Sequence, residues 1–467
     1  MKKSTIHFKI AILFCFLSFY SCEDFVEVDT PNYKLDSQAV FADEQAAKSA
    51  LNGMFNQLFN TSFSGGGSQS VSYLAGLSAD NFIVTSTTQD IIEFYQNNIS
   101  TTNNFNLGLW SGSYNIIYQA NALLEGIENN EDLSPELIME IEGSARFVRA
   151  FTYFYLVNLY GDVPLILTRN YQENALANNT AKEDIYQQII SDLETASHLL
   201  NTTYTDGDRT RPNQYAALSI LARVHLFLEN WEKANEYSSQ VLVNNQYELL
   251  ENLDQVFLAN SKEAIWQISP IGWGNSFSHT RDGNLLIKTP TSNTPVAFSR
   301  DFLETLNSTQ DKRGENWIDE IEIQNDTLFY PFKYKIQFDA SGEITEYSMA
   351  VRLAEQYLIR AEANANMNKL QGAIEDINAI RERAGLSLIQ ASEIALTRNE
   401  VLDLIMKERR RELFTEWGHR WLDLKRYNLN AIIENKEDSN FNPNSWLFPI
   451  PASERMKNPN LSQNPGY

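Results

Sequence analysis

The stretch YAALSILARVHLFLENWEKANEYSSQVL, residues 215–242, contains two segments with apolar residues three and four positions apart, which predicts two helices joined by a short turn. The stretch AEQYLIRAEANANMNKLQGAIEDINAIR, residues 354–381, repeats the pattern. Aligned without gaps, the stretches superpose Ala222 on Ala361, Trp231 on Leu370, Ala234 on Ala373 and Val241 on Ile380. One small alanine per helix and a large apolar residue at the turn are typical of tetratricopeptide repeats. An ordinary helical hairpin is the alternative, because Arg360 and Asn364 stand where that repeat usually has Leu and Tyr.

The rest of the chain extends this helical pattern on both sides of an irregular region. Helical periodicity covers residues 37–245 and 349–433, and the proline-containing tail, residues 434–467, is expected to be extended and laid on the surface. Residues 246–348 are rich in Asn, Ser, Thr, Gly and aromatic side chains and predict an irregular, partly β insertion. Its short strands are expected around Ile265 and Gln267, at Leu285–Lys288 and at Leu328–Phe338. We therefore expect one mainly α domain over residues 22–467.

The amino-terminal residues 1–21 have the layout of a secretory signal peptide. Three lysines are followed by an apolar run at residues 10–19, too short for the roughly 20 residues that span a bilayer. Cys22 follows Ser21 directly, which is the arrangement of a bacterial lipoprotein signal, where the thiol accepts a lipid. We interpret Cys22 as the lipid attachment site and residues 22–36 as an acidic tether. A plain cleaved signal with an incidental cysteine is the alternative.

Composition and motifs argue against several function classes. With 60 acidic and 37 basic residues, the formal net charge is −23, and such a chain repels phosphate backbones and anionic bilayers. We therefore expect no nucleic-acid binding and membrane contact through the lipid anchor only. No phosphate loop, Gly-x-Ser-x-Gly or His-Glu-x-x-His motif is present, and no histidine has a partner at metal-ligand spacing. We expect no catalytic residues, no metal and no cofactor.

The basic run Arg409–Arg411 lies among three glutamates, Glu408, Glu412 and Glu416. On a helix, charges four residues apart form ion pairs worth only tenths of a kcal/mol each. We interpret the run as structural, with ion pairs along its own helix and a role in tying the last helices to the tail.

Several segments, taken in chain order, resemble the SusD/RagB family of outer-membrane nutrient-binding lipoproteins of Bacteroidetes. They are the lipoprotein start at residues 21–25, ARFVRAFTYFYLVNLYGDVPL at 145–165, YLIRAEANA at 357–365, ERRRELFTEWGHRWLDLKRY at 408–427 and the closing WLFPIPASERMKNPNLSQNPGY at 446–467.

The resemblance implies a fold, a location and a partner. Such proteins use tetratricopeptide-like helical hairpins as a scaffold, and irregular segments carry the ligand site. They lie on the extracellular face of the outer membrane, bind glycans or other nutrient oligomers without cleaving them, and deliver them to a TonB-dependent SusC-like transporter. Cys22 would be the anchor, and Glu23 and Asp24 resemble the acidic signal that sends such lipoproteins to the cell exterior.

Sugar binding needs aromatic faces for the ring and polar groups for the hydroxyls, so aromatic residues beside Gly, Asn and Asp in loops are the candidate contacts. Trp273, between two glycines in the insertion, is the first candidate; its alternative role is to plug the insertion onto the helices. The residues expected to act with it are Asn275, Phe277, His279 and Arg281.

A second candidate group lies after the triple-glycine loop Gly65–Gly67, at Tyr73, Asp80 and Asn81, where a structural role is the alternative. Two other functions stay open at this point. A helical-repeat surface scaffold or adhesin would lack a small-molecule pocket. A glycoside hydrolase, the less favoured of the two, would require two acids facing each other across a cleft.

Overall fold

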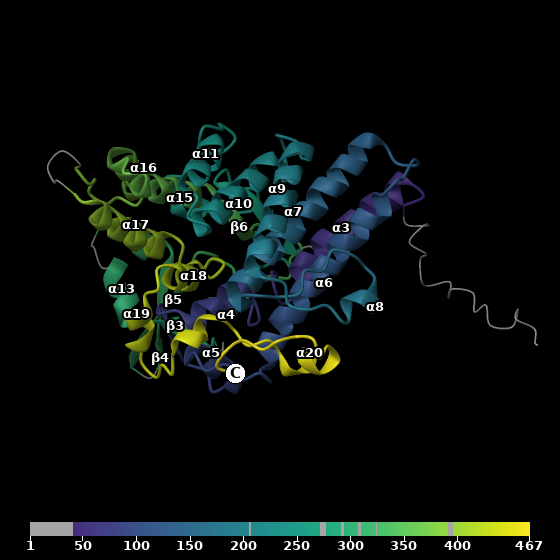
Figure 1. The fold of residues 1–467 in the computed structure, drawn as a ribbon. Coiled ribbons are helices and arrows are strands. Elements are labelled where there is room, and N and C mark those ends of the chain that lie inside the picture. The colour runs from purple at the N-terminus through teal and green to yellow at the C-terminus, as the bar shows by residue number, and fades with distance from the viewer. Residues whose placement is uncertain are drawn as a thin grey trace, which may run out of the picture.

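The computed structural model describes residues 41–204, 207–270, 277–290, 294–306, 310–323, 325–390 and 396–467. This part of the chain is mainly helical, with three small two-stranded sheets, which confirms the predicted fold class (Figure 1). No helix in it is long and apolar enough to cross a membrane.

The amino-terminal half is built on long helices. They are α3 (Glu44–Asn60), α4 (Val71–Ser78), α5 (Gln89–Tyr95), α6 (Asn104–Ile127), α7 (Pro135–Tyr160), α8 (Tyr171–Asn174) and α9 (Lys182–Leu199). Helix α7 begins with Pro135 in its first turn and ends at Gly161, whose φ of 73° a side-chain-bearing residue rarely adopts. These are the start and stop signals that helix termini favour, so the limits of α7 follow from local sequence.

The two repeated stretches form the predicted hairpins, α10 (Gln214–Phe227) with α11 (Trp231–Leu242), and α15 (Leu353–Asn366) with α16 (Leu370–Arg383). Ala222 and Ala234 are buried in one apolar cluster, to which α15 also contributes, so the hairpins pack on each other. The departures from the repeat pattern form polar contacts. Arg360 pairs with Asp376 at 2.6 Å, and Asn364 Oδ1 accepts a 2.9 Å hydrogen bond from Asn235.

The three sheets are antiparallel and join distant segments. They pair β1 (Phe82–Val84) with β3 (Val296–Phe298), β2 (Ala264–Ile268) with β6 (Ser348–Arg352), and β4 (Ile318–Ile323) with β5 (Asp326–Pro331). The expected strand around Ile265 and Gln267 is β2, and β5 covers the first part of Leu328–Phe338. The expected strand at Leu285–Lys288 is wrong. Thr280 Oγ1 accepts a 3.1 Å hydrogen bond from the Gly283 N–H and so caps a short helix, α12 (Arg281–Leu286).

The carboxy-terminal part consists of shorter helices. They are α13 (Arg300–Leu306), α14 (Lys312–Asn316), α17 (Arg398–Glu412), α18 (His419–Arg426), α19 (Asn430–Glu434) and α20 (Ala452–Lys457), with 3₁₀ turns at Leu253–Gln255 and Pro443–Trp446. The tail is not laid on the surface as expected. Phe448 and Ile450 are fully buried, and the Phe448 N–H donates to Leu159 O at 2.7 Å, beside the end of α7 (Figure 1).

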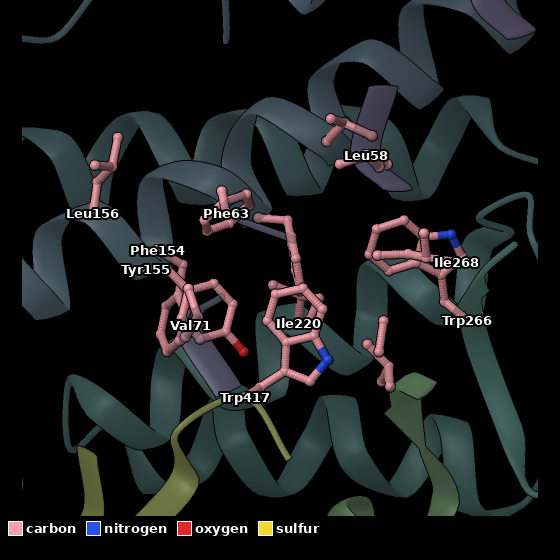
Figure 2. Packing of buried hydrophobic residues seen from close by; sticks show 14 of the residues in the cluster. Leu58, Phe63, Val71, Phe154, Tyr155, Leu156, Ile220, Trp266, Ile268 and Trp417 are labelled. Carbon is pink, nitrogen blue, oxygen red and sulfur yellow. The ribbon is translucent and has the colours of Figure 1, made fainter. Parts of the chain in front are cut away.

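Aromatic rings form the centre of the core (Figure 2). The Phe63 ring lies 6.0 Å from that of Tyr155 on α7 and 6.1 Å from that of Trp417. Trp266 of β2 packs edge-on against Phe151 at 5.0 Å. Edge-to-face pairs of this kind add roughly 0.5–1.5 kcal/mol beyond burial. Phe63, two residues before the triple-glycine loop, is therefore held in the core.

The basic run of α17 is structural, but its ion pairs mostly reach other elements; along its own helix, Arg411 lies 3.8 Å from Glu408. Arg409 pairs with Asp423 of α18 at 2.8 Å, and Arg410 reaches Asp80 at 2.9 Å and Asp301 at 2.7 Å. Arg411 donates to Thr305 O at 2.7 Å. The run thus joins α17 to α18, to the segment after α4 and to the insertion.

Candidate functional site

Three rings gather at the surface of the insertion: Phe277, His279 and Phe338, which we call the aromatic platform. Their centroids lie 5.5 Å apart for Phe277 and His279, 5.6 Å for Phe277 and Phe338, and 5.3 Å for His279 and Phe338. The exposed fraction is 60% for Phe338 and 36% for Phe277, whereas His279 is buried. The Phe277 and Phe338 rings are therefore partly exposed, and the buried imidazole packs against both.

Hydrogen bonds between two chain segments hold the platform together. The Ser278 N–H donates to Asp339 O at 3.1 Å, and Ser278 Oγ donates to Asp339 Oδ2 at 2.5 Å. His279 Nδ1 lies 3.0 Å from the Asp339 backbone nitrogen and 3.0 Å from Asp339 O, so the imidazole is held against the backbone of that residue. Hydrogen bonds from Ser278 and Ser341 lower the pKa of Asp339. These contacts fix the ring positions before any ligand binds, which reduces the entropy cost of binding.

The triple-glycine loop lies beside the segment that carries the platform. The Gly67 N–H donates to Asp282 Oδ1 at 3.0 Å, and the Arg281 guanidinium lies 4.9 Å from the Phe59 ring centroid. Gly66 has a φ of 79°, and a Cβ built on it would lie 2.9 Å from Asp282 Oδ1. A side chain at Gly66 would therefore collide with this contact. The two regions that the sequence indicates separately are neighbours in the fold.

Asp282 is a buried carboxyl at this junction. Burial raises its pKa to about 6, while the Gly67 N–H and the charge of Arg281 act in the opposite direction. The group is thus half-protonated in mildly acidic conditions and ionised at neutral pH.

Tyr73, Asp80 and Asn81 of the second candidate group make their side-chain contacts with other parts of the fold than the platform. Tyr73 is buried in α4, and its hydroxyl has no hydrogen-bond partner among the described residues. Asp80 accepts two 2.7 Å hydrogen bonds from Arg420, and Asn81 Oδ1 accepts one of 2.9 Å from Arg410. These contacts join the segment after α4 to α17 and α18, so we leave the three residues out of the proposed ligand contacts. Asp80 also lines a pocket of about 560 Å³.

Three predicted residues lie outside the described part of the chain: Cys22, Trp273 and Asn275. Within the described ranges, no group of three or more His, Cys, Asp or Glu residues is placed to hold a metal ion.

Comparison with known proteins assigns the chain to a family. Residues 24–226 match the SusD-like family described as "Starch-binding associating with outer membrane", and residues 168–467 match the SusD family. The chain belongs to the SusD family. SusD-like protein P25 of Formosa agariphila is 25% identical, and the alignment covers 98% of this chain and 99% of that protein.

Solved structures of SusD superfamily proteins share the fold. One from Bacteroides vulgatus has a TM-score of 0.80 at 23% identity, and covers 91% of this chain and 100% of its own. A laminarin-binding SusD-like protein has a TM-score of 0.75 at 22% identity, with the same two coverages of 91% and 100%.

For this SusD family member, sequence reasoning missed Phe338 as a platform residue. It followed aromatic residues beside Gly, Asn and Asp, and Phe338 satisfies that rule, because Asp339 and Gly342 follow it. The residue was instead assigned to the end of an expected strand. Only the packing of residues 277–282 against 334–339 shows that its ring belongs with Phe277.

Proposed function

We propose that the chain binds a glycan on the aromatic platform and delivers it, uncleaved, to a SusC-like TonB-dependent transporter. The observation that carries the proposal is the pair of exposed rings, Phe277 and Phe338, on a hydrogen-bonded base. Aromatic faces cover the apolar C–H face of a sugar ring, and rigid rings lose little entropy on binding. The family description as starch-binding and the laminarin-binding structural neighbour support a glycan as the ligand.

Polar groups beside the platform are suited to sugar hydroxyls. Asp339 is half-buried and already accepts hydrogen bonds from Ser341, while Asn284 and Gln337 exchange hydrogen bonds across the same two segments. A neutral oligosaccharide needs this combination of an apolar face and a few oriented polar groups. We include Trp273, Asn275 and Arg281 among the proposed ligand contacts, together with His279 as the supporting ring.

We further propose that a lipid on Cys22 holds the protein on the extracellular face of the outer membrane. The description of the matching family as associating with the outer membrane supports this location. Metabolic labelling with a palmitate analogue tests the anchor. Label should appear on the wild-type chain and be absent from Cys22→Ala, whereas an unlabelled wild-type chain would contradict the proposal.

A glycan array followed by calorimetry tests the platform. For the glycan that binds, Phe338→Ala and Phe277→Ala should each weaken binding by about 1–3 kcal/mol, because each removes one stacking face. Tyr171→Ala is the matched control, since Tyr171 on α8 is an aromatic side chain with 74% exposure outside the platform. Equal losses in all three variants, or none in either platform variant, would contradict the proposal. Sugar release from the bound glycan would instead indicate a hydrolase.

Trp273→Ala provides a separate prediction from sequence alone. If the ring stacks on the ligand, affinity should fall by about 1–3 kcal/mol with an unchanged thermal midpoint. A lowered midpoint with unchanged affinity would indicate the alternative, in which Trp273 packs the insertion onto the helices.

A further inference from the structure

A second cavity, which we call the tail cleft, lies where the carboxy-terminal tail meets the helices. It has a volume of about 1110 Å³ and is lined by the end of α7, the start of α9, the α10–α11 turn, α18 and residues 443–465. None of its lining residues belongs to the aromatic platform. Whatever the cleft binds therefore makes contacts distinct from those of the platform.

The cleft contains a half-buried amine without a carboxylate partner. Lys425 of α18 donates to Asn158 O at 2.5 Å, and no carboxylate of the described residues pairs with it. Its neighbours differ in this respect. Arg426 pairs with Asp423 at 2.9 Å and also with Glu362, and Arg409 pairs with Asp423 at 2.8 Å. Buried cations are costly unless paired, so the lone amine needs an explanation.

A second lysine lines the same cleft. Lys182, at the start of α9, has a side chain that is 60% exposed, and its amine lies 3.8 Å from the exposed Glu183 carboxylate. Burial and, to a smaller extent, the positive charge of Lys182 together lower the pKa of Lys425 to about 7. An anion that bound between the two amines would relieve both the desolvation and the mutual repulsion.

The other lining groups suit a sugar rather than a bare ion. Asn179 Oδ1 is buried and accepts no hydrogen bond from the described residues, and Gln187, Tyr186 and Trp446 also face the cleft. Amides and hydroxyls recognise sugar hydroxyls, and an indole presents an apolar face. Three acidic residues also line the cleft. Asp162 Oδ1 accepts a 2.9 Å hydrogen bond from the backbone N–H of Lys182, while Glu183 and Glu229 are exposed.

We propose that the tail cleft is a second saccharide site, which takes the carboxylate or sulfate group of an acidic oligosaccharide between Lys425 and Lys182. The inference rests on the proposed glycan-binding function and adds to it a charge preference that the platform does not have. The cleft would retain acidic stretches of a polymer whose neutral rings contact the platform.

Calorimetry with two acidic probes and one neutral probe tests the inference. Tetragalacturonate carries carboxylates, a sulfated carrageenan tetrasaccharide carries sulfates, and maltotetraose carries neither. At least one acidic probe should bind with a lower Kd than maltotetraose, and its Kd should rise at least tenfold in Lys425→Met and in Lys182→Glu. Which acidic probe binds identifies the anionic group.

Lys262→Glu is the matched control, because Lys262 is 69% exposed, lies outside the cleft and undergoes the same charge reversal as Lys182. It should leave the Kd unchanged. Because Lys182 is exposed, its variant tests the cleft even if Lys425→Met fails to fold. Equal losses in the Lys182 and Lys262 variants, or acidic binding insensitive to both cleft lysines, would overturn the inference. So would a glutamate hexapeptide that binds in place of either acidic sugar. If any of these results overturns the inference but the protein still binds a neutral glycan, the platform proposal stands.

Discussion

The Asp282 carboxyl shows how one residue couples the candidate site to pH. Its pKa lies near 6 in the fold because burial disfavours the charged form, whereas an unfolded chain restores the ordinary value near 4. Between these two values the folded state binds more protons than the unfolded state. The free energy of unfolding therefore falls as pH rises from about 4 to about 6. Above that window, the full destabilisation by the buried charge of Asp282 is present.

Asp282→Asn should remove this dependence. The amide oxygen can still accept the Gly67 N–H, but no charge is buried, so the variant should gain roughly 2–3 kcal/mol relative to wild type between pH 4 and pH 7. Urea denaturation at the two pH values measures the difference. Glu232→Gln, an exposed carboxylate on α11, is the control and should show no such gain. A wild-type chain that becomes more stable than the variant on going from pH 4 to pH 7 would contradict the argument.

Glu412, one of the glutamates around the basic run, shows why ion-pair partners could not be predicted from helix spacing. Its carboxylate is fully buried and pairs with Arg313 at 3.0 Å, Arg352 at 2.6 Å and Arg383 at 2.5 Å. Spacing along a helix identifies partners three or four residues away, but these arginines are far away in sequence. Tertiary contact alone selects them.

At the scale of elements, the triple-glycine loop depends on backbone geometry. Gly66→Ala places a side chain on a residue with a φ of 79° and brings its Cβ to 2.9 Å from Asp282 Oδ1. Gly207 has nearly the same φ, 75°, but no atom of the described residues lies within 4 Å of a Cβ built there. The backbone strain, about 1–2 kcal/mol for a left-handed residue other than glycine, is therefore common to both positions.

Gly66→Ala should thus destabilise the fold by more than Gly207→Ala does. It should also weaken glycan binding, because it displaces Asp282 and with it the segment that carries the platform. Thermal unfolding and calorimetry of the two variants measure both effects. Equal destabilisation and equal affinity in the pair would show that the loop does not position the site.

The helical hairpins illustrate which elements could be predicted. Their periodicity and paired alanines depend on residues close in sequence, so both hairpins were expected with nearly the observed limits. The prediction of a strand at Leu285–Lys288 was wrong because a short apolar run suits either a strand or a helix. The hydroxyl of Thr280 caps the helix and so favours it here.

At the scale of the whole molecule, the tail closes the core. Phe448 contacts the Phe94 ring at a centroid distance of 5.1 Å and the Tyr160 ring at 6.0 Å, and its N–H bonds to Leu159 O. Asn464 donates to Tyr160 O and to Phe448 O, both at 2.8 Å. The last residues of the chain therefore stabilise helices from its first half.

Phe448→Ala should cost about 3–5 kcal/mol, the usual loss for removing a buried phenylalanine ring. Met456→Ala is the control, since Met456 of α20 lies in the same tail with 79% exposure and should change stability little. Guanidinium denaturation of the two variants gives the comparison. A small effect at Phe448 would mean that the tail is a surface segment, as its prolines suggested.

The sequence by itself determined the helical class, the hairpins and the family, and it indicated the segment around Phe277 as a ligand site. Each of these depends on spacing within a short stretch, where helix geometry converts sequence positions directly into faces and termini. Only the tertiary structure decided that Phe338 joins Phe277, that Gly67 contacts Asp282, that the tail is buried and that Lys425 lies in a cleft where no carboxylate of the described residues pairs with it. These depend on which distant segments meet, and the packing of the whole core determines that.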